Sequence, residues 1–216
     1  MWKIYIIGIL CLICCILGYR IYKCLPGLCP KKRNRINNIK IMVVLGSGGH
    51  TGEMMPIIGK ISDDKRFLRT KFIFISSQTD SLSFQHPLIP EHSDLIQIPR
   101  SRNVGQSFFT SIFTTFYSFA SSLKLILKTP DVLLVNGPGV CFPVVISIFL
   151  GNILGICSTS IVFIESFCRV KSLSLTAKLI YPFCDLFFVQ WPSLLHLKKR
   201  AQLINIFNLD FQQFKK

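Results

Sequence analysis

The chain has 216 residues, of which 50% are hydrophobic, and it carries a formal net charge of +15. This length fits one domain or one half of a two-lobed enzyme, and the hydrophobic fraction is high for a soluble domain. So strong a positive charge indicates either nucleic acid or an anionic membrane surface as a partner. The first forty residues favour the membrane and not nucleic acid.

Residues 4–17 contain no charged side chain, and apolar character continues to Tyr22. This stretch approaches the roughly 20 residues that a helix needs to cross a bilayer. A secretory signal peptide is the alternative, but no small-x-small cleavage pattern follows and the run is longer than a usual signal core. One cation, Lys3, precedes the run and many follow it, so the positive-inside rule places the bulk of the chain in the cytosol.

We therefore predict a transmembrane anchor at residues 1–24, a basic linker at 25–39, a folded cytosolic domain at 40–204 and a tail at 205–216. The tail is a candidate for docking a partner protein. The cysteines agree with a reducing compartment, because most stand where buried free thiols are common. Those in the predicted domain, each alone among apolar residues, are Cys141, Cys157, Cys168 and Cys184.

From residue 40 onward, apolar runs of strand length alternate with longer helical patterns. Runs without in-and-out alternation are expected of strands buried on both faces of a parallel sheet. The predicted strands are Ile41–Leu45, Lys71–Ser76, Leu95–Pro99, Val132–Asn136, Ser160–Glu165 and Leu186–Gln190. The predicted helices are Glu53–Ile61, Gln106–Lys128, Val140–Leu154 and Leu175–Cys184. This alternation predicts an α/β fold with a Rossmann-like parallel sheet that binds ligands at the carboxyl ends of its strands.

The phenylalanine-rich segment Phe108–Leu127 leaves two interpretations open. It can pack on the sheet as a core helix, or it can lie on the bilayer surface with Lys124 and Lys128 at the headgroups. A second membrane span is not predicted, because Pro143 and Gly151 interrupt the other long apolar run.

The most informative segment is Lys40–Glu53, where an apolar strand ends in a glycine-dense turn that opens into a helix. Glycines let a backbone approach a ligand closely, and the free N–H groups of a first helical turn attract anions. The dinucleotide fingerprint G-x-G-x-x-G fails, because Thr51 occupies the third glycine position, and no P-loop lysine follows. His50 lies at the mouth of the turn, where a titratable group can meet a substrate. An ordinary tight connection would explain the glycines equally well.

Other polar clusters follow further predicted strands. Asn136 and the turn at 137–139 permit hydrogen bonding and close approach, although a type II turn explains them too. Glu165 stands at a strand end, four residues before Arg169, as a base beside a phosphate clamp would, although a structural salt bridge is equally compatible. Arg100 and Arg102 supply two more cations at the end of another strand, although solvated surface arginines explain them equally well.

Together these clusters indicate an anionic, phosphate-bearing ligand at one edge of the sheet. No metal site is predicted, because His86 and His92 lie six residues apart in a loop without a partner at ligand spacing.

Five of these motifs occur in the same order in a known family. They are Gly46-Ser47-Gly48-Gly49-His50-Thr51, Ile98-Pro99-Arg100-Ser101-Arg102, Asn136-Gly137-Pro138-Gly139, Glu165-Ser166-Phe167-Cys168-Arg169-Val170 and Val189-Gln190-Trp191-Pro192. With these motifs and the N-terminal anchor, the chain resembles the asparagine-linked glycosylation protein fourteen family over about residues 4–200.

The resemblance implies one half of a GT-B enzyme, similar to the N-terminal, acceptor-binding lobe of the bacterial peptidoglycan GlcNAc transferase. A separate soluble cytosolic subunit would supply the donor-binding lobe for UDP-GlcNAc, and the chain alone would be inactive. The assembled enzyme would add the second GlcNAc, β1,4-linked, to GlcNAc-diphosphodolichol on the cytosolic face of the endoplasmic reticulum membrane. No metal and no other cofactor is implied.

Under this resemblance, His50 and Glu165 are both candidates for the base that takes the proton from the acceptor 4-hydroxyl. The residues implied in substrate binding are Gly46, Ser47, Gly48, Gly49, Thr51, Arg100, Arg102, Asn136, Gly137, Gly139 and Arg169. The tail after Arg200 does not clearly match the segment with which the family docks its partner. The alternatives are a non-catalytic membrane scaffold, a subunit of a related transferase acting on another polyprenyl-diphosphate sugar, and a nucleotide-dependent oxidoreductase, which the broken fingerprint disfavours.

Overall fold

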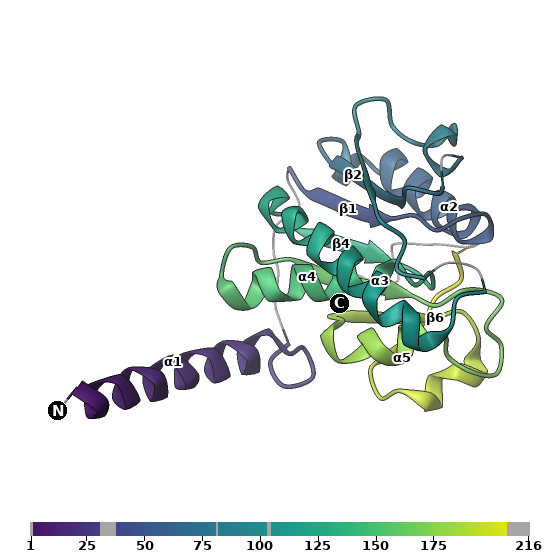
Figure 1. Cartoon of the computed structure of the whole chain (residues 1–216). Helices are drawn as coiled ribbons and strands as arrows, with labels where there is room; N and C mark the ends of the chain where they lie inside the picture. The colour runs from purple at the N-terminus through teal and green to yellow at the C-terminus, as the bar shows by residue number, and fades with distance from the viewer. Residues whose placement is uncertain (1, 31–37, 81, 103–104, 207–216) are drawn as a thin grey trace.

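Seven parallel strands form one sheet in the order β3-β2-β1-β4-β5-β6-β7 (Figure 1). The computed structural model describes residues 2–30, 38–80, 82–102 and 105–206. The strands are β1 (Lys40–Val44), β2 (Lys71–Ser77), β3 (Asp94–Ile98), β4 (Val132–Val135), β5 (Ser160–Ile164), β6 (Leu186–Val189) and β7 (Ala201–Leu203). This is the α/β, Rossmann-like parallel sheet that the sequence predicts.

The apolar runs of the sequence lie buried in this sheet. Met42, Val43 and Val44 are completely inaccessible to solvent, as expected of a strand covered on both faces. The six predicted strands agree with the observed ones to within one residue at each end. β7 was not predicted, because it is an edge strand of three residues whose side chains are mostly exposed and therefore shows no apolar run.

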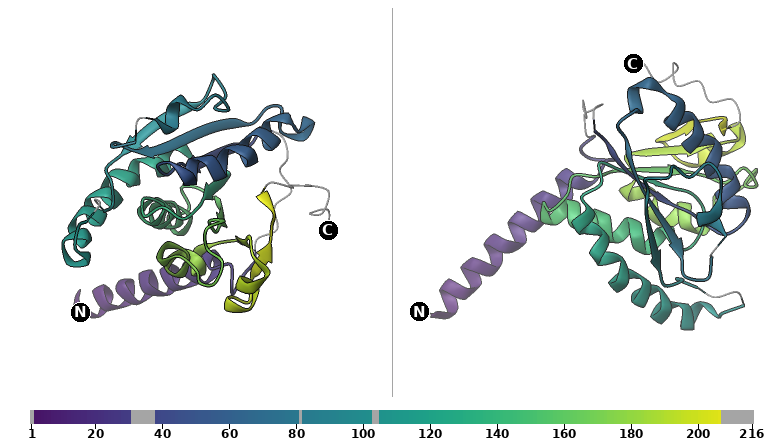
Figure 2. Two further views of the ribbon diagram at one scale, coloured as in Figure 1. Left: turned by 90° about the vertical axis from the view of Figure 1, so that its right-hand side faces the viewer. Right: turned by 90° about the horizontal axis from the view of Figure 1, so that it is seen from above.

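Helices cover both faces of the sheet. The described α-helices are α1 (Trp2–Cys24), α2 (Gly49–Asp63), α3 (Phe108–Ser122), α4 (Cys141–Leu154) and α5 (Leu175–Ile180). On one face, α4 and α5 bury Val144, Ile148 and Ala177, while α2 buries Met54 and Ile58 on the other. Figure 2 shows α2 across the sheet from α3, α4 and α5.

The helix boundaries depart from the predicted ones where turn geometry decides them. α2 begins at Gly49, four residues before the predicted start at Glu53, because Gly48 adopts a φ of 62° and turns the chain directly into the helix. The predicted helix 106–128 is divided into α3 and a 3-10 helix, η3 (Leu123–Lys128). The predicted helix 175–184 is likewise α5 followed by a 3-10 turn, η4 (Tyr181–Phe183).

The helix α1 projects from the lobe into solvent (Figure 1). In the part of the chain that the structure describes, it is the one helix long and apolar enough to cross a membrane. Its apolar side chains are exposed, which suits a membrane anchor and not a core helix. Residues 31–37 of the predicted linker and 207–216 of the predicted tail lie outside the described residues, and the predicted domain boundaries remain a prediction.

The cysteines carry free thiols, and most of those predicted to be buried are buried. Cys141, Cys157 and Cys184 lie inside the lobe, and burial raises the pKa of the Cys141 and Cys184 thiols. The prediction for Cys168 was wrong, because this residue is exposed on the loop that joins β5 to α5.

Candidate functional site

A cleft of about 1100 Å³ opens at the carboxyl ends of the strands. Its lining comes from the turns after β1, β3 and β4, from the loop after β5, and from α3, α4 and α5. A parallel α/β sheet places its ligands at this edge, so the cleft lies where the sequence predicts a site.

Two glycine turns lie against each other at this edge. A Cβ atom on Gly46 would lie 2.6 Å from Cγ of Pro138, and one on Gly137 would lie 2.8 Å from Cε1 of His50. Real Cβ atoms do not approach other atoms so closely, so only glycine at these two positions lets the turns meet. Packing therefore demands Gly46 and Gly137, whether or not they also contact a ligand.

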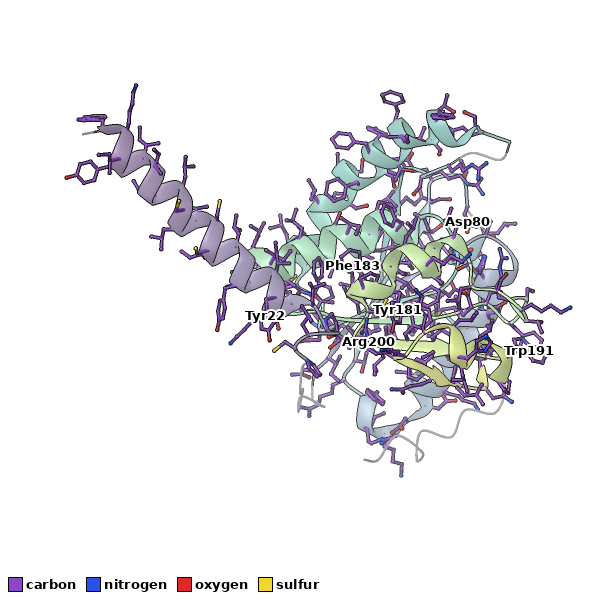
Figure 3. All side chains as sticks on the ribbon, turned by 90° about the horizontal axis from the view of Figure 1, so that it is seen from below. Tyr22, Asp80, Tyr181, Phe183, Trp191 and Arg200 are labelled. Atoms are coloured by element: carbon purple, nitrogen blue, oxygen red, sulfur yellow. The ribbon has the colours of Figure 1, made fainter. Side chains whose placement is uncertain are left out.

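Thr51 supports the first turn from behind. Its buried hydroxyl donates to the carbonyl of Gly46 and lies 2.7 Å from Oγ of Ser83, which donates to the Asp80 carboxylate at 2.6 Å. Figure 3 labels Asp80 at the edge of the lobe. Asp80 and Ser83 were not predicted as site residues, although the polar run after β2 was a signal that could have found them.

His50 lies in the first turn of α2, with its imidazole packed on Gly137. Asn136 Nδ2 donates to the backbone carbonyl of His50 at 3.0 Å, which ties the second turn to this helix. The imidazole Nδ1 is buried without a hydrogen-bond partner among the described residues. Burial lowers the pKa of His50 below its ordinary value of 6.5, an effect that Glu53 opposes and Arg169 reinforces. A neutral imidazole is able to accept a proton from a ligand.

Three arginines line the cleft. Arg100 Nη1 donates to Thr79 Oγ1 at 3.2 Å, and Arg102 donates from Nε and Nη2 to the carbonyl of Gln106 at 2.9 and 2.8 Å. Arg169 is exposed on the loop after β5. No carboxylate occurs among the described residues of the lining. The cleft is therefore positively charged and suited to an anionic ligand.

Glu165 lies behind this lining, completely inaccessible to solvent. Its carboxylate accepts hydrogen bonds from the backbone N–H groups of Ser166 at 3.1 Å and Ser174 at 2.8 Å. Burial raises the pKa of Glu165, and the two amides act in the opposite direction. No ion pair joins Glu165 to Arg169 in the described part of the chain. The carboxylate closes the β5–α5 loop at both ends, and this loop carries Arg169.

Three further side chains hold the same loop. Trp191 Nε1 donates to the carbonyl of Phe167 at 2.7 Å, and Ser193 donates to the carbonyl of Val170. Ser166 Oγ donates to Glu53 at 2.8 Å and so connects the loop to α2. Trp191, labelled in Figure 3, thus supports the site from outside the lining.

The helices give the cleft an apolar wall. The residues that contribute to it are Ile112, Phe116 and Phe119 of α3, Phe142, Pro143 and Ile146 of α4, and Leu175 and Leu179 of α5. Hydroxyl groups that sequence reasoning missed complete the lining, from Ser77, Ser101, Ser111, Thr115, Ser174 and Thr176. The cleft thus offers charge and hydroxyls on the strand side and hydrocarbon on the helix side, which suits an amphipathic ligand.

The structure brings most predicted site residues to this cleft and leaves the others outside its lining. The predicted residues that line it are Gly46, Ser47, His50, Arg100, Arg102, Gly137, Gly139 and Arg169. Those outside the lining are Gly48, Gly49, Thr51, Asn136 and Glu165. No group of three or more metal-ligating side chains occurs in residues 2–30, 38–80, 82–102 and 105–206.

Residues 41–207 match a protein family described as oligosaccharide biosynthesis protein Alg14 like. The chain belongs to the Alg14 family. Similar members include the UDP-N-acetylglucosamine transferase subunit ALG14 of Candida albicans, which is 44% identical over 186 residues, covering 84% of each chain. The proteins of the same name from Schizosaccharomyces pombe and Homo sapiens are 41% and 37% identical, over 77% and 73% of this chain and 82% and 77% of their own lengths.

Two solved structures share the fold of this Alg14 family member. MurG of Acinetobacter baumannii gives a TM-score of 0.52 at 14% identity, over 72% of this chain and 42% of MurG. A UDP-N-acetylglucosamine 2-epimerase gives 0.52 at 13% identity, over 77% of this chain and 48% of the epimerase. The chain thus spans less than half of each, and the likeness confirms the predicted fold of a single GT-B-like lobe.

Proposed function

We propose that this chain is the membrane-anchored, acceptor-binding subunit of a two-subunit UDP-GlcNAc transferase. The reaction adds the second GlcNAc, in β1,4 linkage, to GlcNAc-diphosphodolichol at the cytosolic face of the endoplasmic reticulum membrane. The observation that carries the proposal is the cleft itself. It combines cations, an apolar wall and a neutral imidazole, in an Alg14 family member with an apolar N-terminal helix.

A lipid-linked sugar diphosphate matches both sides of this cleft. Arg100, Arg102 and Arg169 supply charged donors for the diphosphate, together with the backbone amides of Gly46 and Ser47. The first isoprene units would lie on the helical wall, where Phe116 and Leu179 present apolar surface. The sugar would then lie near His50.

In the proposed mechanism His50 is the general base. Its neutral imidazole takes the proton from the acceptor 4-hydroxyl while that oxygen attacks C1 of the donor GlcNAc. The bond from C1 to UDP breaks, its electron pair leaves with UDP, and the new glycosidic bond forms with inversion at C1. Glu53 lies one helical turn after His50 and raises its pKa, so it favours the imidazolium that this step produces.

A partner subunit completes the enzyme in this proposal. The relatives are named as transferase subunits, and the lobe matches less than half of MurG. We therefore assign UDP-GlcNAc binding mainly to a separate soluble subunit, which this chain recruits to the membrane.

The test is a transfer assay on membranes that contain the full chain and a candidate donor-binding subunit, with UDP-GlcNAc and GlcNAc-diphosphodolichol. Loss of a general base lowers the rate by about 10²- to 10⁴-fold, so we expect a decrease of this size in kcat for His50→Ala. His92→Ala is the matched control, because His92 is exposed in a loop outside the cleft. Co-sedimentation of the donor subunit with the membranes measures recruitment separately.

The outcomes separate the alternatives. Turnover that survives His50→Ala and Glu165→Ala with recruitment intact would identify the chain as a non-catalytic scaffold. No product from the wild-type pair would instead indicate a different polyprenyl-diphosphate acceptor.

A further inference from the structure

One arginine forms a polar contact between the anchor helix and the lobe. Arg20, in the last turns of α1, donates from Nε to the carbonyl of Ile153 and from Nη2 to the carbonyl of Asn152 at 3.1 Å. Both carbonyls belong to the final turn of α4, more than 130 residues away in sequence. Arg20 therefore connects two helices that are far apart in the sequence.

The end of α4 is built to receive this side chain. Gly155, with a φ of 77°, and Ile156 donate back to Asn152 and Gly151, which leaves the Ile153 carbonyl without a partner inside the helix. A guanidinium satisfies that carbonyl and also lies at the negative end of the helix dipole. A Cβ atom at Gly155 would lie 2.7 Å from Nη2 of Arg20, so the glycine also leaves the space that the arginine occupies.

The residues after Arg20 continue into the lobe. Cys24 is buried in the hydrophobic core on the α4 and α5 side of the sheet, and Leu25 packs against it. Figure 3 shows Tyr22 where α1 meets the lobe. The anchor is thus fixed by a polar contact and an apolar one about one turn apart at the end of α1.

The helix α3 has its polar face turned inward. Ser118 is fully buried and donates to the carbonyl of Pro99 at 2.8 Å, and Thr114 and Thr115 donate to the carbonyl of Ser101. The opposite face is an apolar stripe whose residues are between 64% and 83% exposed, namely Phe109, Ile112, Phe113, Phe116 and Tyr117. Their spacing places them on one side of the helix. The interpretation of this segment as an ordinary core helix is therefore wrong for Phe109, Phe113, Phe116 and Tyr117.

The stripe and the anchor lie on the same side of the molecule. In the right-hand view of Figure 2, α1 leaves the lobe on the side along which α3 runs, and α3 crosses the direction of α1. A bilayer spanned by α1 would then lie parallel to α3 and next to its exposed face. An apolar stripe of this kind binds at the boundary between headgroups and acyl chains.

We propose that the lobe rests on the membrane at two points, through α1 and through the apolar stripe of α3, and that Arg20 is the positioning residue that holds them in one arrangement. The occupant of the stripe is the lipid surface itself. Ile112 and Phe116 belong both to the stripe and to the cleft wall, so lipid at the stripe borders the cleft. Without Arg20 the helix α1 still spans the bilayer, but the lobe turns about the end of α1 and the stripe leaves the membrane.

Photocrosslinking tests this without any sugar substrate. The full chain is placed in phosphatidylcholine nanodiscs that contain a phospholipid with a diazirine on its upper acyl chain. We expect lipid adducts on α1 and on the peptide that holds Phe109–Tyr117 in the wild type. In Arg20→Ala the α1 adducts remain and the α3 adducts fall about tenfold, as expected for the loss of charge-assisted hydrogen bonds. Lys23→Ala is the matched control. It removes the same charge three residues later, from a side chain that contacts Tyr19 of its own helix.

Hydrogen exchange on the same samples shows whether a loss of adducts comes from misfolding of a variant. Unchanged protection of β1 and β4 shows that the lobe is folded, and faster exchange at 153–157 in Arg20→Ala alone reports the broken joint. Arg20→Lys retains the charge without the planar fork and should be intermediate. The proposal is overturned if wild-type α3 gives no adducts, or if Arg20→Ala and Lys23→Ala behave alike. None of these readouts needs transferase activity, so they stand or fall separately from the proposed function.

Discussion

The imidazole of His50 is largely buried, and this burial sets its response to pH. Burial lowers the pKa of His50 below 6.5, because the charged form loses water that the neutral form does not need. The neutral imidazole is therefore present at pH 7. The unfolded chain binds the proton more tightly, so the stability that His50 contributes is complete above pH 6.5 and is lost as the pH falls through the lower, folded-state pKa.

The acid limb of kcat/KM should accordingly lie below pH 6.5 in the reconstituted pair. Glu53→Gln should move this limb to still lower pH, because the Glu53 carboxylate raises the pKa of His50. Glutamine keeps an oxygen that accepts from Ser166, so the loop contact is retained. Profiles of kcat/KM against pH for the wild type and Glu53→Gln measure the shift. An acid limb at or above pH 6.5 in the wild type would argue against His50 as the base.

We expect Glu165 to contribute mainly to the stability of the fold and not to the chemical step. Glu165→Ala leaves the amides of Ser166 and Ser174 buried without an acceptor, so we expect a loss of about 2–4 kcal/mol in the free energy of unfolding. Glu165→Gln keeps one acceptor and should lose less. Denaturant unfolding of the full chain in detergent measures this, with Glu91→Ala at an exposed loop position as the control. Wild-type stability together with lost turnover would instead make Glu165 the base.

At the scale of elements, α3 is an amphipathic helix whose polar face is buried and whose apolar face is exposed, the reverse of the usual arrangement in a soluble protein. Thr114, Thr115 and Ser118 donate to carbonyls of the 99–101 turn. Phe109, Phe113 and Phe116 are exposed on the other side of the helix. The sequence showed that the helix has two unlike faces but not which of them is buried. The polar face is buried because the turn before the helix supplies hydrogen-bond acceptors for it. A periodic pattern of residues does not predict such acceptors.

Phe113→Glu should separate membrane contact from folding. Phe113 is 79% exposed and outside the cleft, so its replacement should leave the melting temperature unchanged. In bilayers it should raise the KM for the long-chain acceptor several-fold, because a charge opposes insertion of the stripe. Leu68→Glu is the control, since Leu68 is 74% exposed and follows α2 on the other face of the sheet. An equal effect of both substitutions on KM would contradict the membrane contact.

For the whole molecule, the sequence predicted what local pattern determines. Buried runs located the strands, their alternation with helices predicted a parallel sheet, and glycine turns marked its carboxyl edge. The parts that were missed depend on partners far along the chain. Glu165 is separated by nine residues from the Ser174 amide that it binds, and Arg20 by 133 from Ile153. Composition and spacing do not predict such contacts. Glu165, at a strand end, was therefore interpreted as a candidate base, and Arg20 as one of the cations that orient the anchor in the membrane.

The burial of Cys24 has a consequence for how the protein is made. This last residue of α1 belongs to the same core as Met42, Leu133 and Phe163. Domains fold from the N-terminus onward during synthesis, so under the proposed function the anchor enters the bilayer before α4 leaves the ribosome. The nascent lobe then closes around a helix end that is already fixed, and maturation takes place against the membrane surface. A chain whose first helix fails to insert would carry an incomplete core and an uncapped α4, features that chaperones and proteases can act on before any partner arrives.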